Sequence, residues 1–209
     1  MEFKEIYENI VDGQTLEVES GVKAALAKGN GAEDILNNAL VAAMDEVGQR
    51  YEEGDLFVPE MLMAARAMQA GLQVLKPYLA RDDVKAAGKI AIGTIKGDLH
   101  DIGKNLVAMM LEGAGFDVVD LGVDVSPEAF VNAVKEGAQL IGMSALLTTT
   151  MNNMEATVKA LETAGLRNKV KIFIGGAPVT QDYADKIGAE GFAADASSAT
   201  RVARQLIPA

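Results

Sequence analysis

His100 is the only histidine of the chain, and the chain has no cysteine. All imidazole chemistry therefore depends on this side chain, and a zinc site built from several imidazoles or thiolates is excluded. Asp98 lies two residues earlier, a spacing at which a loop carboxylate can bind one ring nitrogen, fix the tautomer and raise the basicity of the other nitrogen. Such an arrangement is typical of a metal-ligating imidazole. The spacing alone, however, favours a plainer interpretation, in which Asp98 caps the following helix and His100 is a solvated loop residue.

Three glycines near predicted ligand-facing loops also have two interpretations. Gly103 follows His100 by three residues, near the start of a predicted helix. It is either an ordinary helix glycine, which lowers the stability of the helix by about 1 kcal/mol relative to alanine, or a position where a side chain would block a large ligand. Gly175 and Gly176 lie at a predicted strand end, where they form either a simple turn or a place where the backbone approaches a ligand closely.

Hydroxyl side chains gather after another predicted strand. They are Ser144, Thr148, Thr149 and Thr150. Ordinary loop polarity explains them, and so does hydrogen bonding to a ligand or to Asp98.

Other chemistries fit poorly. The segment from Gly97 to Gly103 has neither the Gly-Lys-Ser/Thr of a phosphate loop nor a Gly-x-Gly-x-x-Gly dinucleotide fingerprint. The first predicted strand lacks the acidic pair of a two-component receiver. No Gly-x-Ser-x-Gly elbow supports a Ser–His–Asp hydrolase.

The candidate residues must be positioned by a sheet in the second part of the chain, where β-rich runs alternate with helical segments. The predicted strands cover about 90–93, 116–121, 140–143, 170–174 and 191–193, and the predicted helices about 102–114, 126–137, 151–165, 179–187 and 196–207. This alternation predicts a five-stranded parallel sheet covered on both faces, a flavodoxin-like (Rossmann-type) α/β domain. Ligands of such sheets lie beyond the carboxyl ends of the strands, where the candidate loops then meet.

The first part of the chain has helical periodicity and no plausible strand. Apolar residues recur at steps of three and four from Leu36 to Tyr51 and from Val58 to Leu79. Two shorter helices fit about 2–12 and 15–28, and Gly54 suits a helix C-terminal cap. The pattern predicts a small four-helix bundle.

The chain of 209 residues has room for these two domains. We expect the helical domain over residues 1–86 and the α/β domain over residues 87–209, with a linker of mixed charge and small residues at 79–88.

The charge balance points away from nucleic acid. Asp and Glu number 30 against 19 Lys and Arg, so the net charge is −11, which suits docking onto basic patches of protein partners. The N-terminus has no basic region followed by an apolar run, and no stretch reaches 18 uninterrupted apolar residues. We therefore expect a cytoplasmic protein with no membrane partner.

Taken together, Asp98-x-His100-x-x-Gly103, Ser144-x-Leu146 and Gly175-Gly176 resemble the signature of the base-off/His-on corrinoid proteins. This family includes the corrinoid subunits of methanol, methylamine and aryl-ether methyltransferase systems and the cobalamin module of methionine synthase. Upstream, residues 47–60 resemble the end of the third helix and the start of the fourth in the family's helical cap. The resemblance therefore covers nearly the whole chain.

The resemblance implies roles at cobalt. His100 would replace the dimethylbenzimidazole of cobalamin as the lower axial ligand, and Asp98 would hydrogen-bond the far nitrogen of His100. In methionine synthase a hydroxyl side chain continues this chain of hydrogen bonds, at the position that corresponds to Thr150. Threonine keeps the hydroxyl group and adds a methyl group. An imidazole tuned in this way can bind methyl-Co(III), then leave Co(I) and take up a proton.

The resemblance also implies which residues surround the rest of the cofactor. Those at the nucleotide tail would be Ser144, Leu146, Gly103, Gly175, Gly176, Phe192 and Ala193. Tyr51 and Val58 would shelter the reactive face from the helical cap, and Asp101, Ile102 and Thr148 complete the expected binding set.

The function implied is that of a methyl carrier that needs partner enzymes for turnover. A substrate-specific methyltransferase would load the methyl group, a second methyltransferase would pass it to tetrahydrofolate or a thiol, and a reductive activase would restore Co(I). A cobalamin-dependent sensor is the alternative, but the chain has no room for a DNA-binding domain. The small subunit of an adenosylcobalamin mutase usually lacks the helical cap found here at 31–80, and an unliganded flavodoxin-like domain is the remaining possibility.

Overall fold

The computed structural model describes residues 2–81 and 86–207. They form two compact units: one comprises the residues up to Ala86 together with Glu112–Gly115, and the other comprises Ala87–Leu111 and the residues from Phe116 onward. Residues 82–85 of the predicted linker lie outside the described residues.

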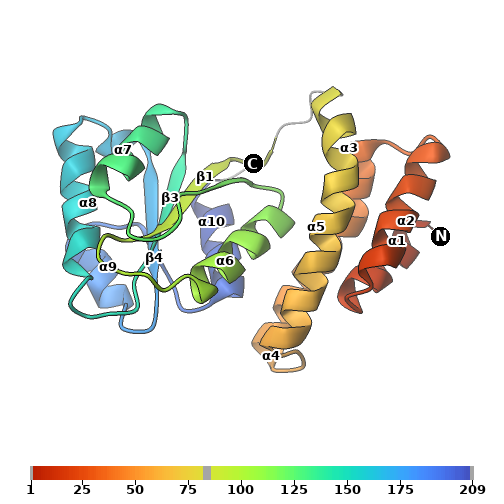
Figure 1. Ribbon diagram of the computed structural model, residues 1–209, viewed down its shortest axis with the longest axis horizontal. Helices are drawn as coiled ribbons and strands as arrows, with labels where there is room; N and C mark the ends of the chain where they lie inside the picture. Colours follow the sequence, from red (N-terminus) through yellow and green to blue (C-terminus); the bar gives the residue numbers. More distant parts are fainter. Residues whose placement is uncertain (1, 82–85, 208–209) are drawn as a thin grey trace. The chain divides into compact units, whose positions relative to one another are not determined.

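The first unit contains the predicted four helices (Figure 1). They are α1 (Glu2–Val11), α2 (Thr15–Ala27), a continuous third helix made of α3 (Ala32–Ile35), a π-helical turn η1 (Leu36–Val41) and α4 (Ala42–Glu53), and α5 (Val58–Arg81). Gly54 ends α4 in the left-handed conformation, with φ 81°, and so confirms the predicted cap.

The predicted apolar stripes form the core of this unit. Leu40, Met44 and Val47 of the third helix and Met61, Met68 and Leu75 of α5 are fully buried or nearly so. The linker prediction is wrong for residues 79–81, because α5 continues through Arg81. Leu, Ala and Arg are strong helix formers, so the change of composition at 79 does not by itself end a helix.

The second unit contains a five-stranded parallel sheet in the order β2-β1-β3-β4-β5, which confirms the flavodoxin-like prediction. Its strands are β1 (Lys89–Thr94), β2 (Asp117–Asp120), β3 (Leu140–Ser144), β4 (Lys171–Gly175) and β5 (Gly191–Ala193). The chain leaves β1 toward β2 on one side and returns to β3 on the other, so the switch point of the topology lies between β1 and β3.

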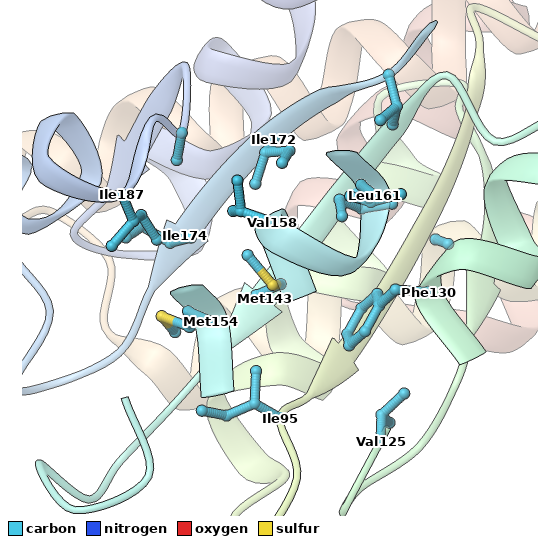
Figure 2. Close-up of a cluster of buried hydrophobic side chains, with 14 of the residues drawn as sticks. Ile95, Val125, Phe130, Met143, Met154, Val158, Leu161, Ile172, Ile174 and Ile187 are labelled. Carbon is cyan, nitrogen blue, oxygen red and sulfur yellow. The ribbon is translucent and has the colours of Figure 1, made fainter. Parts of the chain in front are cut away.

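Helices cover both faces of the sheet. They are α6 (Ile102–Gly113), α7 (Pro127–Lys135), α8 (Asn152–Thr163), α9 (Gln181–Ile187) and α10 (Ala196–Leu206), with a short 3-10 turn η2 (Arg167–Lys169) before β4. In Figure 1, α7, α8 and α9 lie on one face, and α6 and α10 on the other. The core under α7–α9 includes Phe130, Val158 and Leu161 packed against Met143 and Ile172 of the strands (Figure 2).

Strand register aligns four residues at the carboxyl edge of the sheet. Thr94 pairs with Ser144, Ser144 with Gly175, and Gly175 with Ala193. The candidate loops after β1, β3 and β4 therefore leave from neighbouring positions. Among the described residues, no helix is long and apolar enough to cross a membrane.

Candidate functional site

The loop after β1 carries His100 and is tied to its neighbours at several points. The Ile95 N–H donates to the carbonyl oxygen of Ser144 at 3.1 Å, and Ile95 forms an isolated parallel bridge with Val125. The buried Thr94 hydroxyl donates to the carbonyl oxygen of His100 at 2.7 Å. The loop is thus fixed at the switch point, between the segments that follow β2 and β3.

The Asp98 carboxylate is fully buried and accepts hydrogen bonds at both oxygens. Oδ1 accepts from the backbone N–H of His100 at 3.1 Å and from its ring Nδ1 at 2.9 Å. Oδ2 accepts from the N–H groups of Leu146 at 2.8 Å and Leu147 at 3.1 Å, and from the Thr150 hydroxyl at 2.9 Å. The interpretation of Asp98 as a helix cap is wrong, because these donors occupy the carboxylate and α6 begins four residues later, at Ile102.

This arrangement fixes the charge of Asp98 and the tautomer of His100. Burial of Asp98 opposes its ionisation, but hydrogen bonds from the Leu146 N–H, the His100 ring and N–H, and the Leu147 N–H outweigh burial and hold the pKa of Asp98 well below its usual range. An ionised carboxylate only accepts, so Nδ1 carries the ring proton. Neutral His100 therefore presents the lone pair of Nε2, the atom needed for a metal bond.

The side chains around His100 form a surface that suits a large ligand with an apolar periphery. The side chain of His100 is 53% exposed. Leu99 is 71% and Ile102 82% exposed, and the facing loop exposes Leu146 and Leu147 as well. Large apolar side chains that are exposed together mark a binding surface.

The three candidate glycines divide into two kinds. A Cβ at Gly103 would meet no atom within 4 Å, so no neighbour in the protein requires glycine there. Gly176 has φ +126°, and a Cβ there would overlap the carbonyl oxygen of Ala145. At Gly175 a Cβ would come within 2.8 Å of the Ala193 carbonyl oxygen. Close backbone packing therefore explains Gly175 and Gly176, and only Gly103 is left for a ligand to explain.

Only one member of the hydroxyl run reaches Asp98. Thr150 is buried, whereas Thr148 and Thr149 are exposed and Ser144 is half-buried at the end of β3. The Thr150 methyl lies 3.5 Å from where a Cβ of Gly97 would be, so it packs over this glycine.

The other predicted site residues are placed as follows. Asp101, which is exposed, directly precedes α6, and Phe192 is half-buried in β5 beside Ile174 of β4. Tyr51 lies half-buried on α4, and Val58 is exposed at the start of α5, both in the helical unit.

Several residues in or near the site lie outside every sequence motif. Leu147 and Thr94 act through a backbone N–H and a strand-end hydroxyl, which no motif marks. Lys104 is only 2% exposed, and its Nζ contacts both carboxylate oxygens of Asp120 at 2.6 and 2.7 Å and Oδ1 of Asn105 at 2.6 Å. The only feature of the sequence that points to this buried contact is a lysine among mainly apolar α6 residues, directly after Gly103.

Within the part of the chain that the structure describes, no group of three or more His, Cys, Asp or Glu could hold a bare metal ion. One imidazole with a free Nε2 fits a metal that brings its other ligands with it, as cobalt does in a corrin ring. The donor set and the space at Gly103 thus both fit a corrinoid.

Comparison with known proteins agrees with this geometry. Residues 88–203 and residues 2–76 each match a family described as B12 binding domain. The chain is 46% identical over 186 residues to trimethylamine corrinoid protein 1 of Methanosarcina acetivorans, covering 88% of this chain and 86% of the relative. It is 47% identical to dimethylamine corrinoid protein 1 of Methanosarcina mazei, covering 83% and 82%. Among solved structures, the methanol:cobalamin methyltransferase complex MtaBC of Methanosarcina barkeri matches with a TM-score of 0.87 at 31% identity, covering 99% of this chain and 79% of that one.

Proposed function

Because the chain belongs to the B12-binding corrinoid proteins of methyltransferase systems, we propose that it carries a methyl group between two methyltransferases. The observation that carries this proposal is the His100 ring, whose Nδ1 is held at 2.9 Å by the buried Asp98 while Nε2 is left free. The cofactor is a corrinoid, whose cobalt accepts and donates the methyl group when it is bound.

We propose base-off/His-on binding, in which Nε2 of His100 is the lower axial ligand of cobalt. Asp98 would orient the ring for that bond through Nδ1, and Thr150 holds the carboxylate through its hydroxyl, 2.9 Å from Oδ2. The exposed apolar residues Leu99 and Ile102 would exclude water from the side of the bound cofactor that faces His100.

The nucleotide tail would lie along the carboxyl edge of the sheet. Ser144, Gly175 and Ala193 are neighbours in that edge, and Gly103 leaves space at the start of α6. The other residues assigned to the cofactor are Leu146, Thr148, Gly176, Phe192, Asp101 and Ile102. In the helical unit, residues 1–86, Tyr51 and Val58 would shelter the reactive face.

The methyl donor proposed is a methylated amine. The amine corrinoid relatives are 46–47% identical to the chain, whereas the methanol complex is 31% identical. One partner would then be an amine-specific methyltransferase, by analogy with the methanol methyltransferase in MtaBC. The second partner would transfer the methyl group to tetrahydrofolate or a thiol, and a reductive activase would restore inactive protein. The relatives, all named corrinoid proteins, do not favour the sensor alternative.

The single histidine allows a direct test. Protein without a histidine tag, labelled with ¹⁵N-histidine and reconstituted with hydroxocobalamin, should show ¹⁵N splitting in the EPR spectrum of its Co(II) form. A ¹⁴N pattern would mean that dimethylbenzimidazole stays on cobalt and would refute His-on binding. His100→Ala should lose the splitting, while Thr149→Ala, a control at an exposed neighbouring hydroxyl, should keep it.

Substrate and partner need a separate assay. The Co(I) form is mixed with trimethylamine, dimethylamine, monomethylamine or methanol and the matching methyltransferase, and methylation is followed by absorbance. Methylation from methanol alone would refute the proposed substrate class.

A further inference from the structure

Asp124 has an unusual backbone conformation close to the candidate site. It is the one non-glycine residue with positive φ, 53°, in the described part of the chain. L-residues disfavour this left-handed region, and glycine adopts it at the lowest cost. Asp tolerates the region better than most residues do, because its short side chain can bond locally. Since glycine would fit this backbone best, an Asp here indicates a use for the side chain.

Asp124 holds the loop that carries His100 through two hydrogen bonds. Its N–H donates to the carbonyl oxygen of Asp98 at 3.0 Å, and its Oδ1 accepts from the N–H of Gly97 at 2.7 Å. Gly97 is itself left-handed, with φ +82°. Asp124 therefore holds Gly97 and Asp98, and the backbone conformation of these two residues sets the position of the Asp98 side chain.

Asp98 is consequently fixed from two separate segments. The loop after β2 holds its backbone through Asp124, and the loop after β3 holds its carboxylate through Leu146, Leu147 and Thr150. The second set fixes the carboxylate oxygen that faces away from His100. The first set fixes the turn from which Asp98 and His100 both project.

We propose that Asp124 is a positioning residue for the Asp98–His100 pair. The left-handed backbone of Asp124 and its Oδ1 together hold the turn at Gly97 and Asp98, so that the His100 ring keeps the orientation in which its Nε2 would bind cobalt. This assignment rests on the proposed function of His100 as the axial ligand.

The test uses three variants. Asp124→Gly keeps the backbone conformation and removes the acceptor. Asp124→Asn keeps an Oδ1 acceptor and tolerates the left-handed region. Ser126→Ala is the matched control in the same loop, because the Ser126 hydroxyl accepts from the Ala129 N–H at the start of α7, whereas the Gly97 N–H donates to Asp124.

Two measurements test whether Asp124 positions the Asp98–His100 pair. In protein without cofactor, hydrogen exchange of the Gly97 amide should accelerate about fivefold in Asp124→Gly, the equivalent of one exposed hydrogen bond. In the Co(II) form, the ratio of His-on to His-off cobalamin, read from the ¹⁵N splitting, should fall about fivefold as well. Asp124→Asn should stay close to the wild type in both. Ser126→Ala should lower the melting temperature without changing either quantity.

The outcomes separate this proposal from the function on which it rests. If Asp124→Gly changes neither Gly97 exchange nor the His-on ratio, Asp124 has no positioning role. An Asp124→Asn variant as impaired as Asp124→Gly would likewise overturn the role of the acceptor. If the wild type shows no ¹⁵N splitting at all, the assignment of His100 fails, and Gly97 exchange still decides whether Asp124 holds the turn.

Discussion

Gly103→Ala should stabilise the protein without cofactor and weaken its binding of cobalamin. A Cβ at Gly103 would meet nothing within 4 Å, and its φ lies outside the left-handed region, so alanine fits the backbone without strain. Gly103 lies in the first turn of α6, where alanine is the better helix former. A glycine that the protein itself does not require is expected where a ligand comes close to the backbone.

Both effects have a size that can be measured. Replacing glycine by alanine gains about 0.5–1 kcal/mol in a helix, and 1 kcal/mol raises the melting temperature of a chain of this size by about 2–4 °C. If the methyl group overlaps bound cofactor, overpacking costs about 1–3 kcal/mol, which raises the dissociation constant about fivefold to 150-fold.

The assay pairs thermal unfolding of the cofactor-free protein with equilibrium dialysis against hydroxocobalamin. Asn132→Ala is the control, because Asn132 is exposed within α7, and its replacement should raise stability by a similar mechanism without affecting binding. Gly103→Val should weaken binding further than Gly103→Ala does. An unchanged dissociation constant in Gly103→Ala would falsify the idea that cofactor fills this space. A lower melting temperature would show that the protein does require a glycine at this position.

Further variants test the residues around Asp98. Thr150→Val, which keeps the shape and removes the donor to Oδ2, should lower the ratio of His-on to His-off Co(II) cobalamin by about tenfold or more, whereas Thr150→Ser should keep it. The stability difference between wild type and Asp98→Asn should shrink as the pH falls below about 4, because the pKa of Asp98 is depressed in the folded state and the unfolded value is about 3.9. Urea unfolding at several acidic pH values measures this, and a difference that stays constant down to pH 2 would contradict the depressed pKa. Gly176→Ala should destabilise the protein by about 3 kcal/mol or more even without cofactor, since its Cβ would overlap the Ala145 carbonyl oxygen; a melting temperature within 2 °C of the wild type would contradict that close contact.

The periodicity of the sequence predicts most of the sheet and the helices around it. Short, continuous apolar runs that alternate with helical segments restrict a chain of this kind to a few parallel topologies, and the observed strand order is one of them. The π-helical turn η1 was not predicted, because the apolar residues Leu36, Leu40 and Met44 keep a helical spacing through it. The end of α5 was missed for a similar reason, since helix-forming residues continue past Leu79.

The site was predictable only where a side chain carries the chemistry. Asp98, His100 and Thr150 could be singled out from residue types and the resemblance, and the structure brings these three together. The N–H groups of Leu146 and Leu147 could not, because every residue but proline has one, and only the turn after β3 directs these two at Oδ2.

The two oxygens of Asp98 have separate roles, which bears on how the His100 ring would leave cobalt and return in the proposed cycle. Oδ2 is held by donors from the loop after β3, and Oδ1 accepts only from His100, through its N–H and its ring. If the ring turns away, the carboxylate loses one hydrogen bond of the five and stays fixed by the other four. The energetic cost of releasing the ring at this end is then about that of one hydrogen bond to a charged group, about 1.5–3 kcal/mol. Asp98 therefore remains in position for the ring to return, since the four remaining donors are the backbone N–H of His100 and three groups of the loop after β3, and none of them is part of the ring.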